Sequence, residues 1–181
     1  MGGVLMTYGE EIKKSMTMLG KDKRTIFIGQ QVAYSGSIMS KSLDDVSMDK
    51  KIEMPLIEDA QMGMSIGLSL EGFIPISIYP RMDFLIIAMN QLANHLDKIE
   101  EMSMGRFKPK VIVRTAIGST KPLYPGLQHC SDYTEGFKKM FKNIKVIKFD
   151  SSKDIYSTYE KALNDKESYI LIEVADKYGE K

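Results

Sequence analysis

Short apolar runs alternate along the chain with longer amphipathic segments. Five runs are nearly continuous in apolar side chains and lie at 25–28, 73–79, 110–115, 145–149 and 168–174. Such runs are typical of strands that are buried on both faces of a parallel sheet. Five further segments are predicted as helices, at 8–19, 59–70, 83–102, 132–141 and 153–164. Strands alternating with helices indicate an α/β fold, which we expect to be a single three-layer domain over 1–181, with a mainly parallel sheet covered by helices on both faces.

Local signals refine this outline. The segment 33–51 is rich in Ser, Asp, Lys and Gly with little periodicity, so we expect a surface loop there. Gly63 and Gly67 lie four residues apart on one helix face, where small residues let another helix approach closely. Asp132, with Glu135 three residues later, resembles a capping box that opens the next helix.

The composition excludes several classes of function. Lys and Arg number 25 against 24 Asp and Glu, and the two signs are interspersed, so no long-range field favours nucleic acid or an anionic membrane. No apolar span reaches membrane length and no signal peptide is present. Cys130 is the single cysteine, which rules out an internal disulfide framework and fits the cytosol. We therefore expect a cytoplasmic protein with neither nucleic-acid nor membrane partners.

Familiar metal and nucleotide motifs are missing. The two histidines, His95 and His129, form no Cys/His cluster with metal-ligand spacing, so we expect no metal site built from this chain alone. Neither G-x-G-x-x-G nor G-x-x-x-x-G-K-[ST] occurs, so the sequence does not support nucleotide sites of those two types.

Glu58 stands where an extended segment passes into a helix, three residues after Pro55. By spacing alone, an acidic residue in a first helical turn is explained by its interaction with the helix dipole, which contributes roughly 0.3–1 kcal/mol. A catalytic carboxylate is the alternative interpretation, and the residue pattern by itself does not require it.

Five stretches together resemble one family. They are P-L-I-E-D-A-Q-M-G-M-S-I-G-L-S-L-E-G-F-I-P-I, M-D-F-L-I-I-A-M-N-Q-L-A-N-H, V-I-V-R-T-A-I-G, G-L-Q-H-C-S and I-L-I-E-V-A-D-K-Y-G. In this order and spacing they resemble the beta subunits of 2-oxo-acid dehydrogenases. More distantly, they are similar to the middle domain of transketolase and of deoxyxylulose-phosphate synthase. The resemblance covers about residues 8–179 and implies the pyrimidine-binding domain of a thiamine-diphosphate enzyme.

The resemblance implies roles for three residues. Glu58 would hydrogen-bond the N1′ nitrogen of the cofactor's aminopyrimidine and thereby favour removal of the proton from the reactive thiazolium carbon. Phe84 would stack on the pyrimidine, although a core aromatic at a helix start is the alternative. His129 would face the substrate carbonyl, the alternative being an ordinary loop histidine. The run S-T-K-P-L-Y-P-G replaces the family's glycine-rich loop, and Cys130 interrupts its Q-H-S pattern.

Two other polar residues admit functional readings. His95 lies within a predicted helix, which favours a structural or subunit-interface position. Arg81 precedes the helix that carries Phe84 and could bind an anionic substrate group, although an exposed arginine is the commoner explanation.

The resemblance also implies a second chain. The family grips the diphosphate through a divalent metal with a G-D-G…N signature, and no G-D-G occurs here. We therefore expect an alpha-type partner to hold magnesium and the diphosphate, in an α2β2 assembly that acts on a 2-oxo acid or a ketose. The further C-terminal domain of transketolase type is expected to be absent. The alternative function is a non-catalytic regulatory or scaffold module that retains the fold.

Overall fold

The sheet has six strands, all parallel, in the order β2-β1-β3-β4-β6-β5. A computed structural model describes residues 6–34 and 36–180 of the chain. The strands are β1 (Thr25–Gly29), β2 (Lys51–Glu53), β3 (Ile74–Tyr79), β4 (Ile112–Ile117), β5 (Ile144–Lys148) and β6 (Ser168–Val174). The predicted strands are thus all present, and β2 is an additional one.

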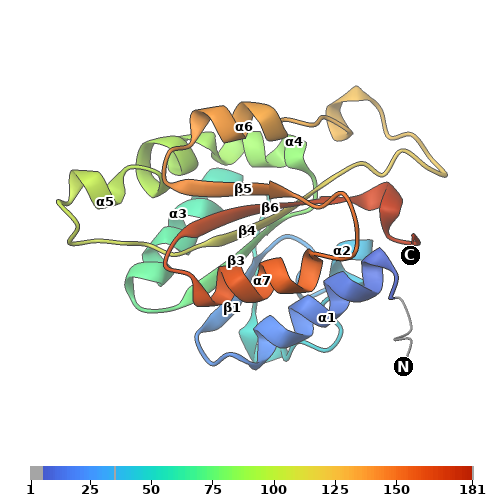
Figure 1. Cartoon of the computed structure of the whole chain (residues 1–181), viewed down its shortest axis with the longest axis horizontal. Coiled ribbons are helices and arrows are strands. Elements are labelled where there is room, and N and C mark those ends of the chain that lie inside the picture. The colour runs from blue at the N-terminus through green and yellow to red at the C-terminus, as the bar shows by residue number, and fades with distance from the viewer. Residues whose placement is uncertain (1–5, 35, 181) are drawn as a thin grey trace.

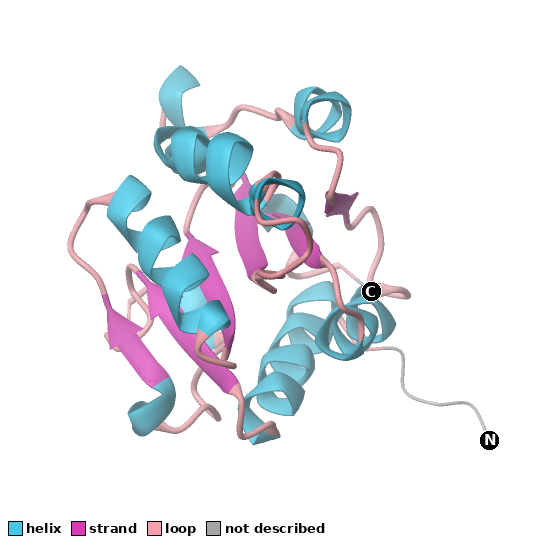
Figure 2. Cartoon of the chain, turned by 90° about the vertical axis from the view of Figure 1, so that its left-hand side faces the viewer, coloured by secondary structure: helices cyan, strands magenta, loops and turns pink. Residues whose placement is uncertain are grey.

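Helices cover both faces of this sheet (Figures 1 and 2). The helices are α1 (Tyr8–Lys21), α2 (Ile38–Lys41), α3 (Glu58–Leu70), α4 (Met82–Leu85), α5 (Ile99–Met102), α6 (Thr134–Met140) and α7 (Ile155–Asn164). One core cluster joins the sheet to α1, α2 and α7, and the other joins it to α3, α4 and α6. The predicted α/β fold with a covered parallel sheet is confirmed.

The prediction of a surface loop at 33–51 was wrong. Met39, Leu43 and Val46 are buried in the same core cluster as α1. The segment contains α2, which begins at Ser37 with a capping box formed with Ser40, and it ends in β2. These apolar residues have the i, i+4, i+7 spacing of a helix, but the Ser, Asp and Lys residues around them give the segment the composition of a surface loop, which concealed their burial.

The predicted long helix at 83–102 is divided. After α4 the chain forms a 3-10 turn at Ile86–Ala88 and a π-helical segment at Gln91–Leu96 before α5 begins. All of these conformations place apolar residues three to five positions apart, so a hydrophobic pattern does not distinguish them.

Two finer predictions also required correction. Asp132 accepts a hydrogen bond from the Thr134 backbone at 2.9 Å, but Glu135 pairs with Lys138, so no capping box forms. An added Cβ at Gly63 would lie 3.7 Å from the Gln91 side chain, whereas one at Gly67 would meet nothing within 4 Å. Close helix approach was therefore predicted correctly at the first glycine and wrongly at the second.

A buried ion pair joins the neighbouring strands β4 and β6. Arg114 of β4 donates from Nε and Nη2 to the two carboxylate oxygens of Glu173 of β6, at 2.6 and 3.0 Å. Both side chains are fully buried. The Tyr159 hydroxyl of α7 also donates to Glu173, and Arg114 donates from Nη1 to Ser42 just after α2. The pair thereby connects the sheet to the helical layer beside it.

Electrostatics keep this network in one protonation state. Burial lowers the pKa of Arg114, but the neighbouring Glu173 carboxylate raises it, and the net pKa lies above the ordinary value. Burial and then the charge of Glu173 raise the pKa of Tyr159 well above its ordinary value. Arg114 therefore stays charged and Tyr159 stays neutral throughout the physiological range.

We predict that Glu173→Gln destabilises the fold by roughly 3–5 kcal/mol, because it leaves a buried guanidinium without a counter-charge. Urea unfolding followed by far-UV circular dichroism measures the change. Glu135→Gln, which breaks the exposed pair with Lys138, is the matched control and should leave the unfolding midpoint unchanged. A Glu173→Gln midpoint equal to that of the wild-type chain would contradict the structural role of the pair.

Candidate functional site

The carboxyl ends of the parallel strands lie on the right in Figure 1. They border a cavity of about 380 Å³. It is lined by residues that follow four of the strands, among them Gln30 after β1, Arg81 after β3, Ser119 after β4 and Tyr178 after β6. From β1 the chain passes to β2 on one side and then to β3 on the other. In open parallel sheets, ligands bind beyond the carboxyl ends of the strands at such a switch point.

Close contact between β1 and β3 fixes the floor of this region. A Cβ at Gly29 would lie 2.3 Å from the Ile78 carbonyl oxygen, and Gly29 has a φ of +155°. The buried Gln61 of α3 donates from Nε2 to the Ile78 carbonyl at 3.0 Å and to Ser77 Oγ at 3.2 Å. Glycine at the end of β1 and an amide from α3 thus lock the start of the helix against the strand ends.

Glu58 is the first residue of α3 and is only 7% exposed. Gln30 donates from Nε2 to its Oε1 at 3.2 Å, and the Tyr79 hydroxyl donates to its backbone carbonyl at 3.2 Å. Ile57, the N-cap residue, forms no side-chain hydrogen bond to the first turn of α3. The partial positive charge of the helix N-terminus therefore acts on the Glu58 carboxylate without a competing cap. Glu58 is therefore a buried carboxylate that is linked through Gln30 to the cavity. A residue that only interacted with the helix dipole could remain on the surface.

Phe84 and His129 lie together. Phe84, in α4, lines the cavity, and the His129 ring meets it edge-on with centroids 5.7 Å apart and planes at 88°. In the described part of the chain, Nδ1 of His129 is shielded from solvent and has no hydrogen-bond partner. Of the three predicted site residues, Phe84 and His129 are therefore in direct contact. Glu58 is connected to the same cavity through Gln30.

Two residues at the start of α4 hold the histidine loop. Arg81 donates from Nη1 to the carbonyls of Gly118 at 2.5 Å and of His129 at 2.9 Å. The Asp83 carboxylate accepts from the Ser131 backbone N–H at 3.3 and 3.4 Å. Arg81 is partly buried, so the reading as a merely exposed arginine was wrong.

The sequence interpretation overlooked Gln30 and Tyr178 as members of this site. A usable signal existed, because both closely follow strands, and residues that follow parallel strands gather at one edge of the sheet. His95 is exposed on the π-helical segment, and Cys130 Sγ lies 4.0 Å from the Ser119 carbonyl.

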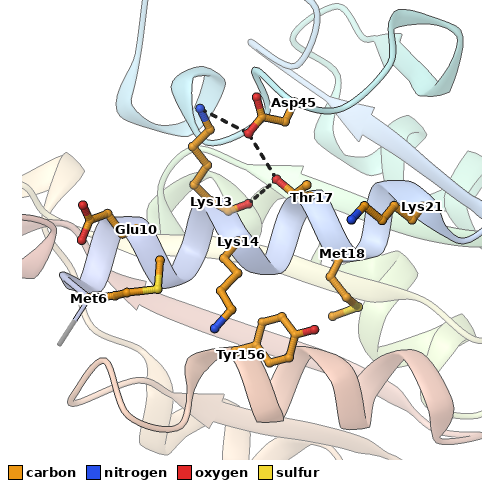
Figure 3. A pocket seen from close by; sticks show the side chains of 9 residues that line it. All are labelled: Met6, Glu10, Lys13, Lys14, Thr17, Met18, Lys21, Asp45 and Tyr156. Carbon is orange, nitrogen blue, oxygen red and sulfur yellow. Dashed lines mark hydrogen bonds and ion pairs between the residues drawn. The ribbon is translucent and has the colours of Figure 1, made fainter. Parts of the chain in front are cut away.

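A second hollow, of about 530 Å³, runs along α1 beside α7 (Figure 3). Lys13 Nζ lies 3.4 Å from an Asp45 carboxylate oxygen, and Lys14 Nζ lies 4.5 Å from the centre of the Tyr156 ring. Because both lysines already have partners within the chain, this hollow has fewer unpaired polar groups for a ligand than the cavity at the strand ends.

Residues 6–34 and 36–180 contain neither a metal-ligand cluster nor a membrane-spanning helix. No group of three or more His, Cys, Asp or Glu residues in this range is placed to hold a metal ion. Within the same range, every helix is too short or too polar to span a bilayer.

Comparisons with known proteins identify relatives. No protein-family model matches the chain. The chain is 30% identical over 175 residues to the mitochondrial pyruvate dehydrogenase E1 component subunit beta of Ascaris suum, covering 95% of this chain and 46% of that protein. It is 26% identical over 166 residues to the 3-methyl-2-oxobutanoate dehydrogenase subunit beta of Mycobacterium tuberculosis, covering 88% and 46%. The chain thus spans about half the length of these relatives.

Solved structures share the fold. A split-gene transketolase, described as an inactive beta4 tetramer, matches with a TM-score of 0.72 and 16% identity, over 98% of this chain and 53% of that one. Transketolase from Campylobacter jejuni matches with a TM-score of 0.72 and 14% identity, over 92% and 25%. The family resemblance predicted from the sequence is confirmed: the homologues of this chain are E1 beta subunits of pyruvate and branched-chain 2-oxo-acid dehydrogenases, and its structural neighbours are transketolases.

Proposed function

We propose that this chain is the pyrimidine-binding, beta-type subunit of a split thiamine-diphosphate enzyme, with Glu58 as the carboxylate that activates the cofactor. The observation that carries the proposal is the buried Glu58 carboxylate, joined through Gln30 to a cavity that Phe84 lines at the strand ends. Homology to E1 beta subunits supports the same assignment.

The residues present suit an aminopyrimidine. A buried carboxyl group can share a proton with a ring nitrogen, and the one hydrogen bond given to Glu58 Oε1 comes from an amide that can be displaced or can turn to a ligand. Phe84 offers an aromatic face beside the cavity. When bound, thiamine diphosphate would supply a carbon acid that becomes a nucleophile toward a carbonyl.

Glu58 then acts as a proton partner. Burial keeps water from competing for its carboxylate, and the N-terminus of α3 orients it without a competing side-chain cap. A shared proton between this carboxyl group and a pyrimidine nitrogen is a general acid–base device, which contributes typically 10²–10⁴ in rate.

His129 is proposed as the group that faces the substrate. Its Nδ1 has no hydrogen-bond partner among the described residues, and Phe84 packs against its ring. An imidazole can donate a proton to a reacting carbonyl oxygen and take one back from the hydroxyl that forms there. Arg81 and Asp83 hold the backbone of this loop at His129 and at Ser131 and so limit its movement.

The proposed alpha-type partner would complete the site by holding magnesium and the diphosphate. Leu56 and Ile57, just before Glu58, are 76% and 54% exposed. Ile86 and Ile87, on the turn packed against α3, are 40% and 57% exposed. Apolar surface gathered next to a candidate site is typical of an interface, which supports assembly with a second chain, proposed as α2β2.

Substrates of the proposed enzyme are 2-oxo acids or ketoses, cleaved next to the carbonyl with decarboxylation or two-carbon transfer. A non-catalytic regulatory or scaffold module is the second candidate. It is favoured by S-T-K-P-L-Y-P-G, which stands where the family has a glycine-rich loop.

We predict that Glu58→Gln in the pair reconstituted with an alpha-type partner slows hydrogen–deuterium exchange at the reactive thiazolium carbon by about two orders of magnitude or more. Glutamine keeps the size and hydrogen-bonding capacity of the side chain but cannot share the proton. Exchange is followed by proton NMR after acid quenching. Glu71→Gln, at the exposed end of α3, is the control and should exchange at the wild-type rate. Wild-type exchange in Glu58→Gln would refute the role.

We predict that Phe84→Ala weakens thiamine-diphosphate binding by the reconstituted pair roughly two- to tenfold, because it removes a ring that stacks on the pyrimidine. Calorimetry with magnesium present measures the affinity. Phe107→Ala, which truncates a ring that is 52% exposed and remote in sequence, should bind like wild type. If the wild-type pair binds no cofactor, the regulatory or scaffold module becomes the better assignment.

A further inference from the structure

Arg81 is the arginine that lines the cavity at the strand ends. Its Nη1 donates to two backbone carbonyls, those of Gly118 and His129, which lie eleven residues apart in the connection between β4 and α6. These two contacts fix the guanidinium at the wall of the cavity, and no hydrogen-bond partner within the described chain is assigned to Nε or Nη2.

The charge of Arg81 is not neutralised within residues 6–34 and 36–180. Arg24 and Arg114 each form an ion pair with a carboxylate, and Arg106 is exposed on the surface. Arg81 forms no such pair among the described residues, and its two acceptors are neutral backbone carbonyls. A partly buried cation without a counter-charge is costly to maintain, which makes an anionic ligand the natural complement.

The chain itself contains the geometry of such a contact. Arg114 uses Nη1 for a neutral oxygen, that of Ser42, and grips the Glu173 carboxylate with Nε and Nη2. Arg81 likewise uses Nη1 for neutral oxygens, and the same Nε/Nη2 edge is left without a partner. This edge presents two parallel N–H donors, which match the two oxygens of a carboxylate.

We propose that Arg81 determines substrate specificity by binding the carboxylate of a 2-oxo acid through its Nε/Nη2 edge. The inference rests on the proposed function for the identity of the substrate, but the anion site itself is a property of this chain alone. Arg81 Nη1 holds the backbone carbonyl of His129, so the guanidinium that would bind the carboxylate and the proposed acid–base residue belong to one hydrogen-bonded unit.

The test is a titration of the full-length purified chain with pyruvate, followed by ¹H–¹⁵N NMR. We predict saturable shifts in the wild-type chain and binding weakened roughly ten- to hundredfold in Arg81→Met, which loses charge-assisted hydrogen bonds. Arg81→Lys keeps the charge without the paired donors and should bind with intermediate affinity. Arg106→Met removes an exposed arginine and should bind like wild type. Circular dichroism verifies that each variant is folded.

Three results would overturn the proposal. The first is equal pyruvate affinity in Arg81→Met and wild type; if the His129 ring signals move in that variant, Arg81 only positions the loop. The second is the absence of saturable pyruvate shifts in wild type. The third is tighter binding of inorganic phosphate than of pyruvate, which would assign the site to a phosphate ester. None of these titrations uses the cofactor or a partner chain. Failure of the proposed cofactor chemistry is therefore measured separately, by hydrogen–deuterium exchange at the thiazolium carbon in Glu58→Gln.

Discussion

The contact between β1 and β3 at Gly29 sets the position of the candidate site. No side chain fits there, because a Cβ would fall 2.3 Å from the Ile78 carbonyl oxygen. With the two strands this close, Gln61 reaches the backbone of both ends and holds the start of α3 over them. Glu58 is carried to the strand ends by that helix, and Gln30 meets it directly after β1. The site is therefore a consequence of how tightly two neighbouring strands pack.

Polar and charged groups are fully paired in the Arg114 network but only partly paired at the carboxyl ends of the strands. Deep between β4, β6 and α7, the Arg114 guanidinium has a complete set of partners and a raised pKa, so it is fixed as structure. At the strand ends, Arg81, His129 and Glu58 each keep donor or acceptor capacity that the described chain does not fill. Among these groups, His129 Nδ1 is shielded from solvent, and buried polar atoms without a partner are rare, so this edge is better suited to a ligand than the filled Arg114 network is.

Much of the fold could be predicted from the sequence, because strands buried on both faces must be apolar throughout, as the fully buried β3 shows. The burial of Met39 was missed although its segment has an i, i+4, i+7 apolar spacing, because the polar residues around it have the composition of a loop. Glu58 and Phe84 were predicted as site residues through family resemblance, which supplied what spacing lacked. The environment of Arg81 was hidden because its acceptors lie 37 and 48 residues away along the chain.

The arrangement explains why such a chain would depend on a second one. Glu58, Phe84 and His129 come from segments that begin immediately after strands, so all of them are at one rim and none of them forms an opposite wall. Beside them, Leu56 and Ile87 remain exposed, and exposed apolar area adjoining half-satisfied polar groups is stabilised when another surface covers both. A partner that desolvates this rim would strengthen each electrostatic contact there, because hydrogen bonds and ion pairs gain energy as water is excluded. Under the proposed function, assembly and activation of the carboxylate would be the same physical event.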